Sequence, residues 1–153
     1  MGDGFGRVTR LTGAATGSVT SVPMTQKEHW KSTPDDHDYP AARDYLSLVI
    51  PDTEAAAVVK ALMNCPLTHR KAKDLLRAAQ LPVLPQTNVH VSKDLEKVNK
   101  GEQLSPVLLM RGDASCAAPL VVADGYHRIC ASYVLDEDTD IPCRLTDRPV
   151  RRS

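Results

Sequence analysis

Aromatic residues are scarce in this chain, and neither sign of charge is in excess. Phe, Trp and Tyr make up 4% of the 153 residues, so a core must be built mainly from Leu, Val, Ile and Ala. The 19 basic residues equal the 19 acidic ones, so no overall field draws the protein to nucleic acid or to an anionic membrane. Any site for a polyanion must therefore be local, and the composition argues against a nucleic-acid partner.

Paired cysteines and long apolar runs are also missing. The four cysteines, at positions 65, 116, 130 and 143, form no Cys-x-x-Cys pair, which argues against a thiolate zinc site. No segment approaches the roughly 20 apolar residues of a membrane span. The stretch RVTRLTGAATGSV is too rich in Thr and Gly for the apolar part of a secretory signal. We therefore expect one cytoplasmic domain with reduced thiols and no membrane partner.

The first 40 residues differ in composition from the rest of the chain. MGDGFGRVTRLTGAATGSVTSVP is rich in Gly, Thr and Ser, and MTQKEHWKSTPDDHDYP is polar. We expect residues 1–40 to form a flexible arm, with order beginning near Ala41 and with Trp30 or Tyr39 docking on the domain. Met24 could be the native start, so the sequence leaves open whether residues 1–23 belong to the native protein.

Residues 41–81 are expected to be largely helical. ARDYLSLVI is short enough for a strand or a brief helix. DTEAAAVVKALMNCP predicts a helix that Asp52 or Thr53 caps and Pro66 ends. LTHRKAKDLLRAAQLP predicts a second helix with Thr68 as its cap, and Leu75 and Leu76 would lie on its apolar stripe.

Strands and helices are predicted to alternate from residue 82 to residue 146, before a tail at 147–153. TNVHVS alternates like a strand or an extended loop, and SKDLEKVNKG predicts a short helix capped by Ser92 and ended by Gly101. SPVLLMRG and PLVVAD predict strands, YHRICASYVL a helix, DEDTD a solvated acidic loop and IPCRLT a closing strand. This order predicts an α/β domain of the mixed α+β kind.

The junction between PLVVAD and YHRICASYVL combines several groups that suit an anion. The first turn of a helix has unpaired N–H groups and a positive dipole end, and Gly125 leaves the backbone open to a ligand. Arg128 can hold a phosphate with two hydrogen bonds, and His127 adds another donor. Asp124 beside such a site would hold Mg²⁺ or accept a proton. Tyr126 could stack on a base or a substrate ring.

Each of these residues also has a purely structural interpretation. Asp124 could cap the helix, and Arg128 could pair with the acidic loop 136–140. His127 could be an exposed helix residue, and Tyr126 could pack at the helix start. A motif this short does not choose between the two interpretations by its spacing alone.

The segment ADGYHRICASYVL, followed by DTDIPCRL, resembles the signature of the ParB/sulfiredoxin superfamily. In that signature a strand leads to a Gly-x-(His or Arg)-Arg turn, then to a helix and to an Ile-Pro strand. GEQLSPVLLMRG is similar to the preceding family segment, in which a Pro opens a strand. The resemblance covers residues 82–146 and implies a small mixed α/β fold, here preceded by two helices. Residues 40–146 as a whole look like a bacterial family of ParB-like proteins, which implies no particular activity.

The resemblance further implies that nucleotide phosphates bind at this turn, because members of the superfamily use ATP, ADP or CTP. Gly125, His127 and Arg128 match the phosphate-binding turn. Asp124 matches the acidic residue of the free-serine kinases of the superfamily. Lys93 lies near the position of a nucleotide-contacting lysine in sulfiredoxin.

Two departures from the family pattern limit these expectations. Sulfiredoxin has a cysteine between the Gly and the His, where this chain has Tyr126, so sulfinic acid reduction by that route is excluded. Cys130, one helical turn further on, is expected to be a packed core thiol. Partition proteins carry a helix-turn-helix domain after this module, whereas this sequence stops soon after its last predicted strand, so we expect no centromere-type DNA binding.

The sequence thus predicts a domain that binds a nucleotide or a phosphorylated small molecule, with Mg²⁺ at Asp124. An ATP- or ADP-dependent phosphotransferase and an NTPase are the catalytic options, with Asp124 as a base and Arg128 stabilising phosphoryl charge. The alternatives are a protein-interaction module and a DNA-associated module. The DNA-associated module would use a basic patch on the second helix, which is more simply a solvated helix face; its residues are His69, Arg70, Lys71, Lys73 and Arg77. His90 is expected on the surface of a strand.

Overall fold

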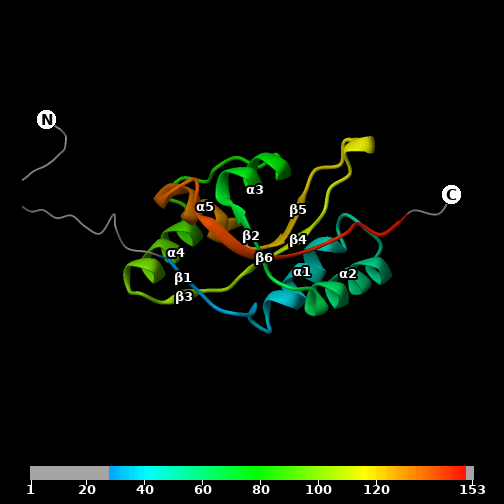
Figure 1. Cartoon of the computed structure of the whole chain (residues 1–153), viewed down its shortest axis with the longest axis horizontal. Helices are drawn as coiled ribbons and strands as arrows, with labels where there is room; N and C mark the ends of the chain where they lie inside the picture. Colours follow the sequence, from blue (N-terminus) through cyan, green and yellow to red (C-terminus); the bar gives the residue numbers. More distant parts are fainter. Residues whose placement is uncertain (1–27, 151–153) are drawn as a thin grey trace, which may run out of the picture.

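A computed structural model describes residues 28–150, and these form a mixed α/β fold, as the sequence predicts. Figure 1 shows the arrangement of the elements. In chain order they are β1 (His29–Trp30), α1 (Asp38–Leu46), α2 (Asp52–Asn64), β2 (Thr68–Lys71), α3 (Ala72–Ala79), α4 (Val89–Asn99), β3 (Gln103–Leu104), β4 (Val107–Met110), the 3₁₀ turn η2 (Ala114–Cys116), β5 (Val121–Asp124), α5 (Tyr126–Leu135) and β6 (Asp140–Thr146).

The main sheet has four strands in the order β2-β6-β4-β5. Strand β6 is antiparallel to β2 and parallel to β4, and β4 is antiparallel to β5. Strands β1 and β3 form a separate parallel pair of two residues each. Asp124 ends the edge strand β5 opposite Leu108, and α5 follows after the single residue Gly125.

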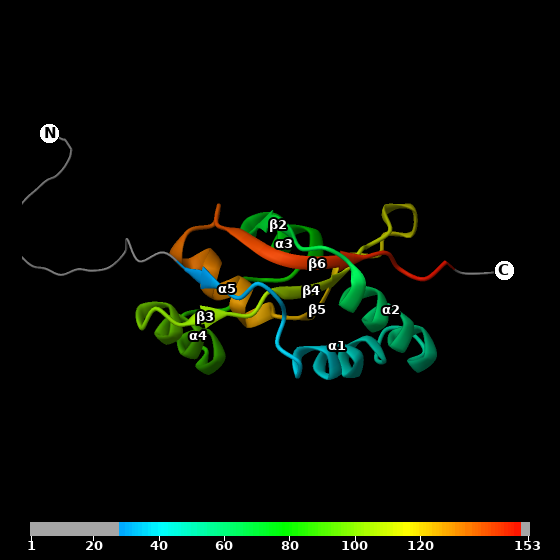
Figure 2. The same ribbon diagram turned by 60° about the horizontal axis from the view of Figure 1, so that its bottom comes forward.

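Strand β4 separates two hydrophobic cores. Val107 and Leu109 belong to a core with α3 and α5, whereas Leu108 and Met110 belong to a core with α1 and α2. Successive side chains of a strand point to opposite faces, so a strand covered on both faces must be apolar throughout. Figure 2 shows α1 and α2 along one side of the sheet. The burial on both faces explains the uninterrupted VLLM run of β4.

The prediction that residues 68–71 belong to a helix is wrong. They form β2, whose Thr68 and Lys71 lie opposite Cys143 and Asp140 of β6, and only residues 72–79 are helical as α3. The pairing with β6 satisfies the backbone groups of this segment, so a distant strand decides its conformation.

The predictions for residues 87–92 are also wrong in part. Helix α4 begins at Val89, not after Ser92, because the Asn88 side chain accepts hydrogen bonds from the backbone N–H groups of His90 and Val91, at 3.0 and 3.2 Å. These bonds satisfy two of the amides that lack a partner at a helix start. The alternation in TNVHVS is therefore part of a helix.

Order begins well before Ala41, contrary to the expectation of an arm up to residue 40. Trp30 packs against the first core, and Tyr39 is buried in the second, so both residues dock on the domain as expected. The Ser132 hydroxyl also donates to Glu28, which ties the start of the described chain to α5. The part of the expected arm at 1–27 and the tail residues 151–153 lie outside the described residues. Within residues 28–150, no helix is long and apolar enough to cross a membrane.

The cap of α4 can be tested by replacing Asn88 with Ala. The change removes the acceptor of two amide hydrogen bonds, so we expect the free energy of unfolding to fall by about 1 kcal/mol in urea titrations. Asn99→Ala, at the exposed end of the same helix, is the matched control and should cause no loss. Equal losses in the two variants would contradict the capping role.

Candidate functional site

A pocket of about 390 Å³ opens between α4, the start of α5 and the segment that leads from β1 into α1. The residues that the sequence singles out and that line this pocket are Lys93, Asp124, Gly125, His127 and Arg128. Lys93 comes from α4, far along the chain from the others. The fold therefore brings the lysine and four of the five residues of the 124–128 turn into one pocket.

Tyr126 is not among the residues that line this pocket. Its hydroxyl donates a 2.6 Å hydrogen bond to the carbonyl of Pro82, and its ring packs against the core on that side. Burial raises the pKa of the phenol. The structure thus agrees with the interpretation that Tyr126 packs at the helix start and gives no support to stacking on a ligand in this pocket.

Gly125 is required by both its backbone conformation and its surroundings. Its φ is +112°, a region that residues with a side chain rarely adopt. A Cβ here would lie 2.4 Å from Val107 Cγ1 and 2.8 Å from Arg128 Nη2. The glycine therefore lets the turn lie directly against β4 and the guanidinium.

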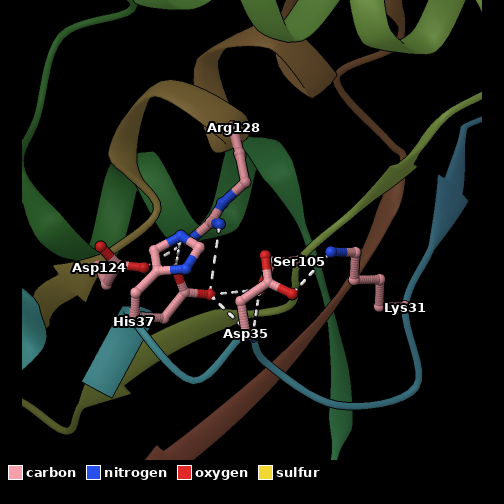
Figure 3. A network of polar contacts seen from close by, with 7 residues as sticks. Lys31, Asp35, His37, Ser105, Asp124 and Arg128 are labelled. Atoms are coloured by element: carbon pink, nitrogen blue, oxygen red, sulfur yellow. Dashed lines mark hydrogen bonds and ion pairs between the residues drawn. The ribbon is translucent and has the colours of Figure 1, made fainter. Parts of the chain in front are cut away.

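Arg128 is held between two carboxylates. Its Nη2 donates to Asp124 Oδ2 at 2.7 Å (Figure 3). Its Nη1 lies 3.5 Å from Asp38 Oδ2, and its side chain is only 14% exposed. The alternative that Arg128 pairs with the acidic loop 136–140 is wrong. Asp138 and Asp140 instead pair with Lys73 and Lys71. The guanidinium is positioned at the pocket, and its charge is already balanced.

Asp38 is the main site residue that the sequence analysis missed. It is 3% exposed at the first turn of α1, inside the segment expected to be a flexible arm. Its carboxylate accepts from the Ser105 hydroxyl and, at 3.2 Å, from the backbone N–H of Asp35. The one sequence signal was its place two residues before Pro40, because Pro favours the first turn of a helix.

Burial raises the pKa of Asp124 to about 6, and the negative charge of Asp38 adds to this rise, whereas Arg128 opposes it. A carboxyl group with this pKa is mostly ionised at pH 7 and exchanges its proton near neutral pH. It is therefore suited to accept a proton from a bound hydroxyl group.

The α4 side of the pocket carries Lys93, Lys97, His90 and Asp94. Within residues 28–150, no carboxylate lies within ion-pair distance of either lysine. His90 lies in the helix with its ring 4.7 Å from that of His127, so its expected place on a strand surface is wrong. Burial lowers the pKa of His127, and His90 lowers it further.

Cys130 is fully buried in α5, as expected, and its sulfur accepts a hydrogen bond from the Leu84 N–H at 3.4 Å. Burial raises the pKa of this thiol, so it is poorly suited to act as a nucleophile.

Oxygen donors for a hard cation lie on the side of the pocket opposite α4. Ligand atoms of Asp35, His37 and Asp38 lie within 4.8 Å of one another. Lys31 Nζ is 2.6 Å from Asp35, and Asp38 already binds Ser105 and Arg128. The carboxylates of Asp35 and Asp38 offer oxygen ligands of the kind that Mg²⁺ prefers, and Asp124 lies beside Asp38.

Comparison of the chain with models of known protein families, with curated proteins and with solved structures finds no match. The resemblance to the ParB/sulfiredoxin superfamily therefore stays a prediction.

The fit at Gly125 can be tested with Gly125→Ala, with Gly101→Ala as the control. Gly101 also has a positive φ, +75°, but no atom lies within 4 Å of a Cβ placed there. Backbone strain alone should cost Gly101→Ala about 1 kcal/mol of unfolding free energy. Gly125→Ala should lose about 2 kcal/mol more, because Val107 must move. Similar losses in urea titrations would show that the close packing at Gly125 is unimportant.

The ion-pair network can be tested with Arg128→Met. Two partly buried carboxylates then lose their partner, so we expect a loss of about 3 kcal/mol at pH 7.5. The loss should shrink at pH 5. Arg128 lowers the pKa of Asp124, so this pKa rises further in the variant, and the proton that Asp124 binds on acidification stabilises the variant more than the unmodified protein.

Arg43→Met is the control for this network, because Arg43 pairs with Asp52 at 2.9 Å on the exposed surface. This variant should unfold almost as the unmodified protein does at both pH values, because exposed ion pairs contribute little. A loss in Arg128→Met that does not change between pH 7.5 and pH 5 would refute the charge-based explanation.

Proposed function

We propose that this chain is a ParB/sulfiredoxin-like domain that binds a nucleotide or a phosphorylated small molecule, together with Mg²⁺, in the pocket beside α5. The convergence of Lys93 with the 124–128 turn in one pocket carries the proposal. Its volume, about 390 Å³, lies in the range usual for small-ligand sites. The first amides of α5 add N–H donors of the kind that bind phosphate.

The division of charge within the pocket supports a ligand that carries both a phosphate and a cation. Lys93 and Lys97 lie on the α4 side, and Asp35 and Asp38 lie on the opposite side. Asp124, at the end of β5, lines the same pocket. A metal-bound phosphate presents anionic oxygens to the lysines and its cation to the carboxylates, so both sides of the pocket gain partners.

Arg128 must change partners to contact such a ligand. One of the two ion pairs of Arg128 is with Asp124. When the Asp124 carboxylate binds Mg²⁺ instead, the guanidinium loses part of its balancing charge and gains a reason to bind a phosphate oxygen. Bound Mg²⁺ would neutralise charge on the phosphate oxygens. In this arrangement the ion pair with Asp38 keeps the guanidinium of Arg128 at the N-terminal end of α5.

The catalytic options of the proposal are a small ATP- or ADP-dependent phosphotransferase and an NTPase. Ionised Asp124 can take the proton of an acceptor hydroxyl or of water, and Arg128 can stabilise charge on the transferred group. All four cysteines are free thiols, as the proposed cytoplasmic location would leave them.

The alternative of a DNA-associated module has less support. Its basic residues do not share one helix face, because His69, Arg70 and Lys71 lie in β2. Lys71 and Lys73 are also paired with Asp140 and Asp138. A protein-interaction module that binds a phosphorylated or carboxylate-bearing partner stays as the second candidate, since the same pocket could hold such a group.

Ligand binding can be tested by thermal unfolding and calorimetry with ATP, ADP and CTP, each with and without Mg²⁺. At least one nucleotide at millimolar concentration should raise the melting temperature, and more strongly with Mg²⁺. Lys93→Ala should weaken the binding about tenfold, through the loss of one charged contact. Lys60→Ala is the matched control, because Lys60 is an exposed lysine on α2 that does not line the pocket.

The absence of any shift with all three nucleotides would refute the nucleotide proposal. Equal weakening in Lys93→Ala and Lys60→Ala would place the binding elsewhere. If a nucleotide binds and is turned over, Asp124→Asn should abolish turnover; turnover that survives in this variant would remove Asp124 as the base. Binding without turnover in the unmodified protein would favour the interaction module.

A further inference from the structure

A group of three potential metal ligands lies where the segment after β1 enters α1. Asp35, His37 and Asp38 come from one short stretch of chain, and a ligand atom of each lies within 4.8 Å of the other two. Among residues 28–150, no other group of three histidine, cysteine or acidic side chains converges in this way. All three residues line the pocket. The ligands of a metal site are therefore already close together here.

The buried carboxylate of Asp38 has one oxygen that is not used by the fold. The side chain is only 5% exposed, and its contacts with Ser105, with the backbone N–H of Asp35 and with Arg128 all involve Oδ2. Oδ1 accepts no hydrogen bond from residues 28–150. It lies 3.6 Å from His37 Nε2, which is too long for a hydrogen bond. A buried carboxylate oxygen without a donor is unfavourable, and a bound cation would supply the missing interaction.

The separation of His37 Nε2 and Asp38 Oδ1 suits two ligands of one ion. Ligand atoms that are each roughly 2.0–2.2 Å from a metal lie about 3.0–3.5 Å from each other. The observed 3.6 Å is close to this range, and the His37 side chain is 82% exposed, so a small rotation of the ring closes the difference. The backbone N–H of Asp35 donates to Ser105 Oγ at 3.0 Å and to Asp38 Oδ2 at 3.2 Å, which fixes the turn that carries the ligands.

Lys31 is the partner of Asp35 in the absence of an ion. Its Nζ lies 2.6 Å from Asp35 Oδ1, and Figure 3 shows the two side chains directed toward each other. The hydrogen bond from Lys31 lowers the pKa of Asp35, so this carboxylate is ionised at neutral pH, as a metal ligand must be. Both side chains are partly exposed, and ion pairs of this kind are weak. A divalent cation can therefore displace the ammonium group.

We propose that Asp35, His37 and Asp38 bind a first-row divalent transition-metal ion, which displaces Lys31 from Asp35. One imidazole nitrogen and two carboxylate oxygens are a mixed set of ligands that such ions accept, whereas Mg²⁺ prefers oxygen ligands alone. Three protein ligands leave further coordination positions open to water or to a phosphate oxygen. The inference rests on the proposed function only for the use of the ion by a phosphate ligand, because the ion itself binds without a nucleotide.

The site can be tested by titrating the whole chain, stripped of metal with a chelator, with Co²⁺ in a calorimeter. We expect one Co²⁺ per chain, bound about tenfold more tightly than Mg²⁺. Asp35→Asn and His37→Ala should each weaken Co²⁺ binding about tenfold or more, and His37→Ala should leave the weaker Mg²⁺ binding almost unchanged. Lys31→Met should strengthen Co²⁺ binding about threefold, because the competing ammonium group is removed.

His90→Ala and Asp94→Asn are the matched controls, because they remove another imidazole and another carboxylate that line the same pocket. Both variants should bind Co²⁺ as the unmodified protein does. Asp38 is left unchanged in the test, since it also holds Arg128 and its loss could unfold the protein.

Several results would overturn the proposal. They are the absence of Co²⁺ binding at millimolar concentration, unchanged binding in both Asp35→Asn and His37→Ala, and equal losses in the two control variants. Weaker Co²⁺ binding in Lys31→Met would show that the ion does not displace the ammonium group. The titration contains no nucleotide, so Co²⁺ binding by a protein that binds no nucleotide would refute the proposed function and support the metal site.

Discussion

The ion pairs of Arg128 with Asp38 and Asp124 are the constraint on which the rest of the structure depends. They connect the end of β5 and the first turn of α5, which follow each other in the chain, to the first turn of α1, which comes much earlier in the sequence. The guanidinium is mostly buried, so removing either carboxylate would leave charge without its partner. The same guanidinium is the group that an anion in the pocket would use. The contact that holds the fold together is thus also a contact that a ligand must rearrange.

Local sequence patterns were sufficient to predict the fold where neighbouring residues determine the structure. The helix over DTEAAAVVKALMN and the strand, glycine and helix around Asp124 follow from apolar spacing and from one residue that must adopt a positive φ. They were insufficient where a segment distant in the chain determines the local conformation. Residues 68–71 pair with β6, and no pattern within them shows this. Asn88 and Ser92 are both good helix caps, and the sequence alone does not show that the Asn88 side chain is the one that accepts the first amide hydrogen bonds of α4.

The residues of the candidate site fall into the same two groups: those that the sequence indicates and those that only the structure shows. The motif itself shows Asp124, Gly125, His127 and Arg128, and the family resemblance adds Lys93. Tyr126 lies next to the pocket, with its ring 5.7 Å from that of His127, but its hydroxyl is directed to the carbonyl of Pro82. The positions of Asp38 and His90 in the pocket are known only from the structure. A polar residue in a polar segment gives no sign that it will be buried beside a distant arginine or stacked on a distant histidine.

The balance of charged side chains in the pocket limits the kinds of ligand that it can bind. Its lining contains four carboxylates and four lysine or arginine side chains, and Arg128 and Lys31 already have partners. A bare anion would have to compete with Asp38 and Asp124 for Arg128 and would leave those carboxylates without partners in a partly buried place. An anion that brings a divalent cation avoids this cost, because the cation replaces Arg128 as the partner of the carboxylates. If the pocket binds the proposed phosphate ligand, the buried ion pairs therefore favour a metal-bound phosphate over a free one.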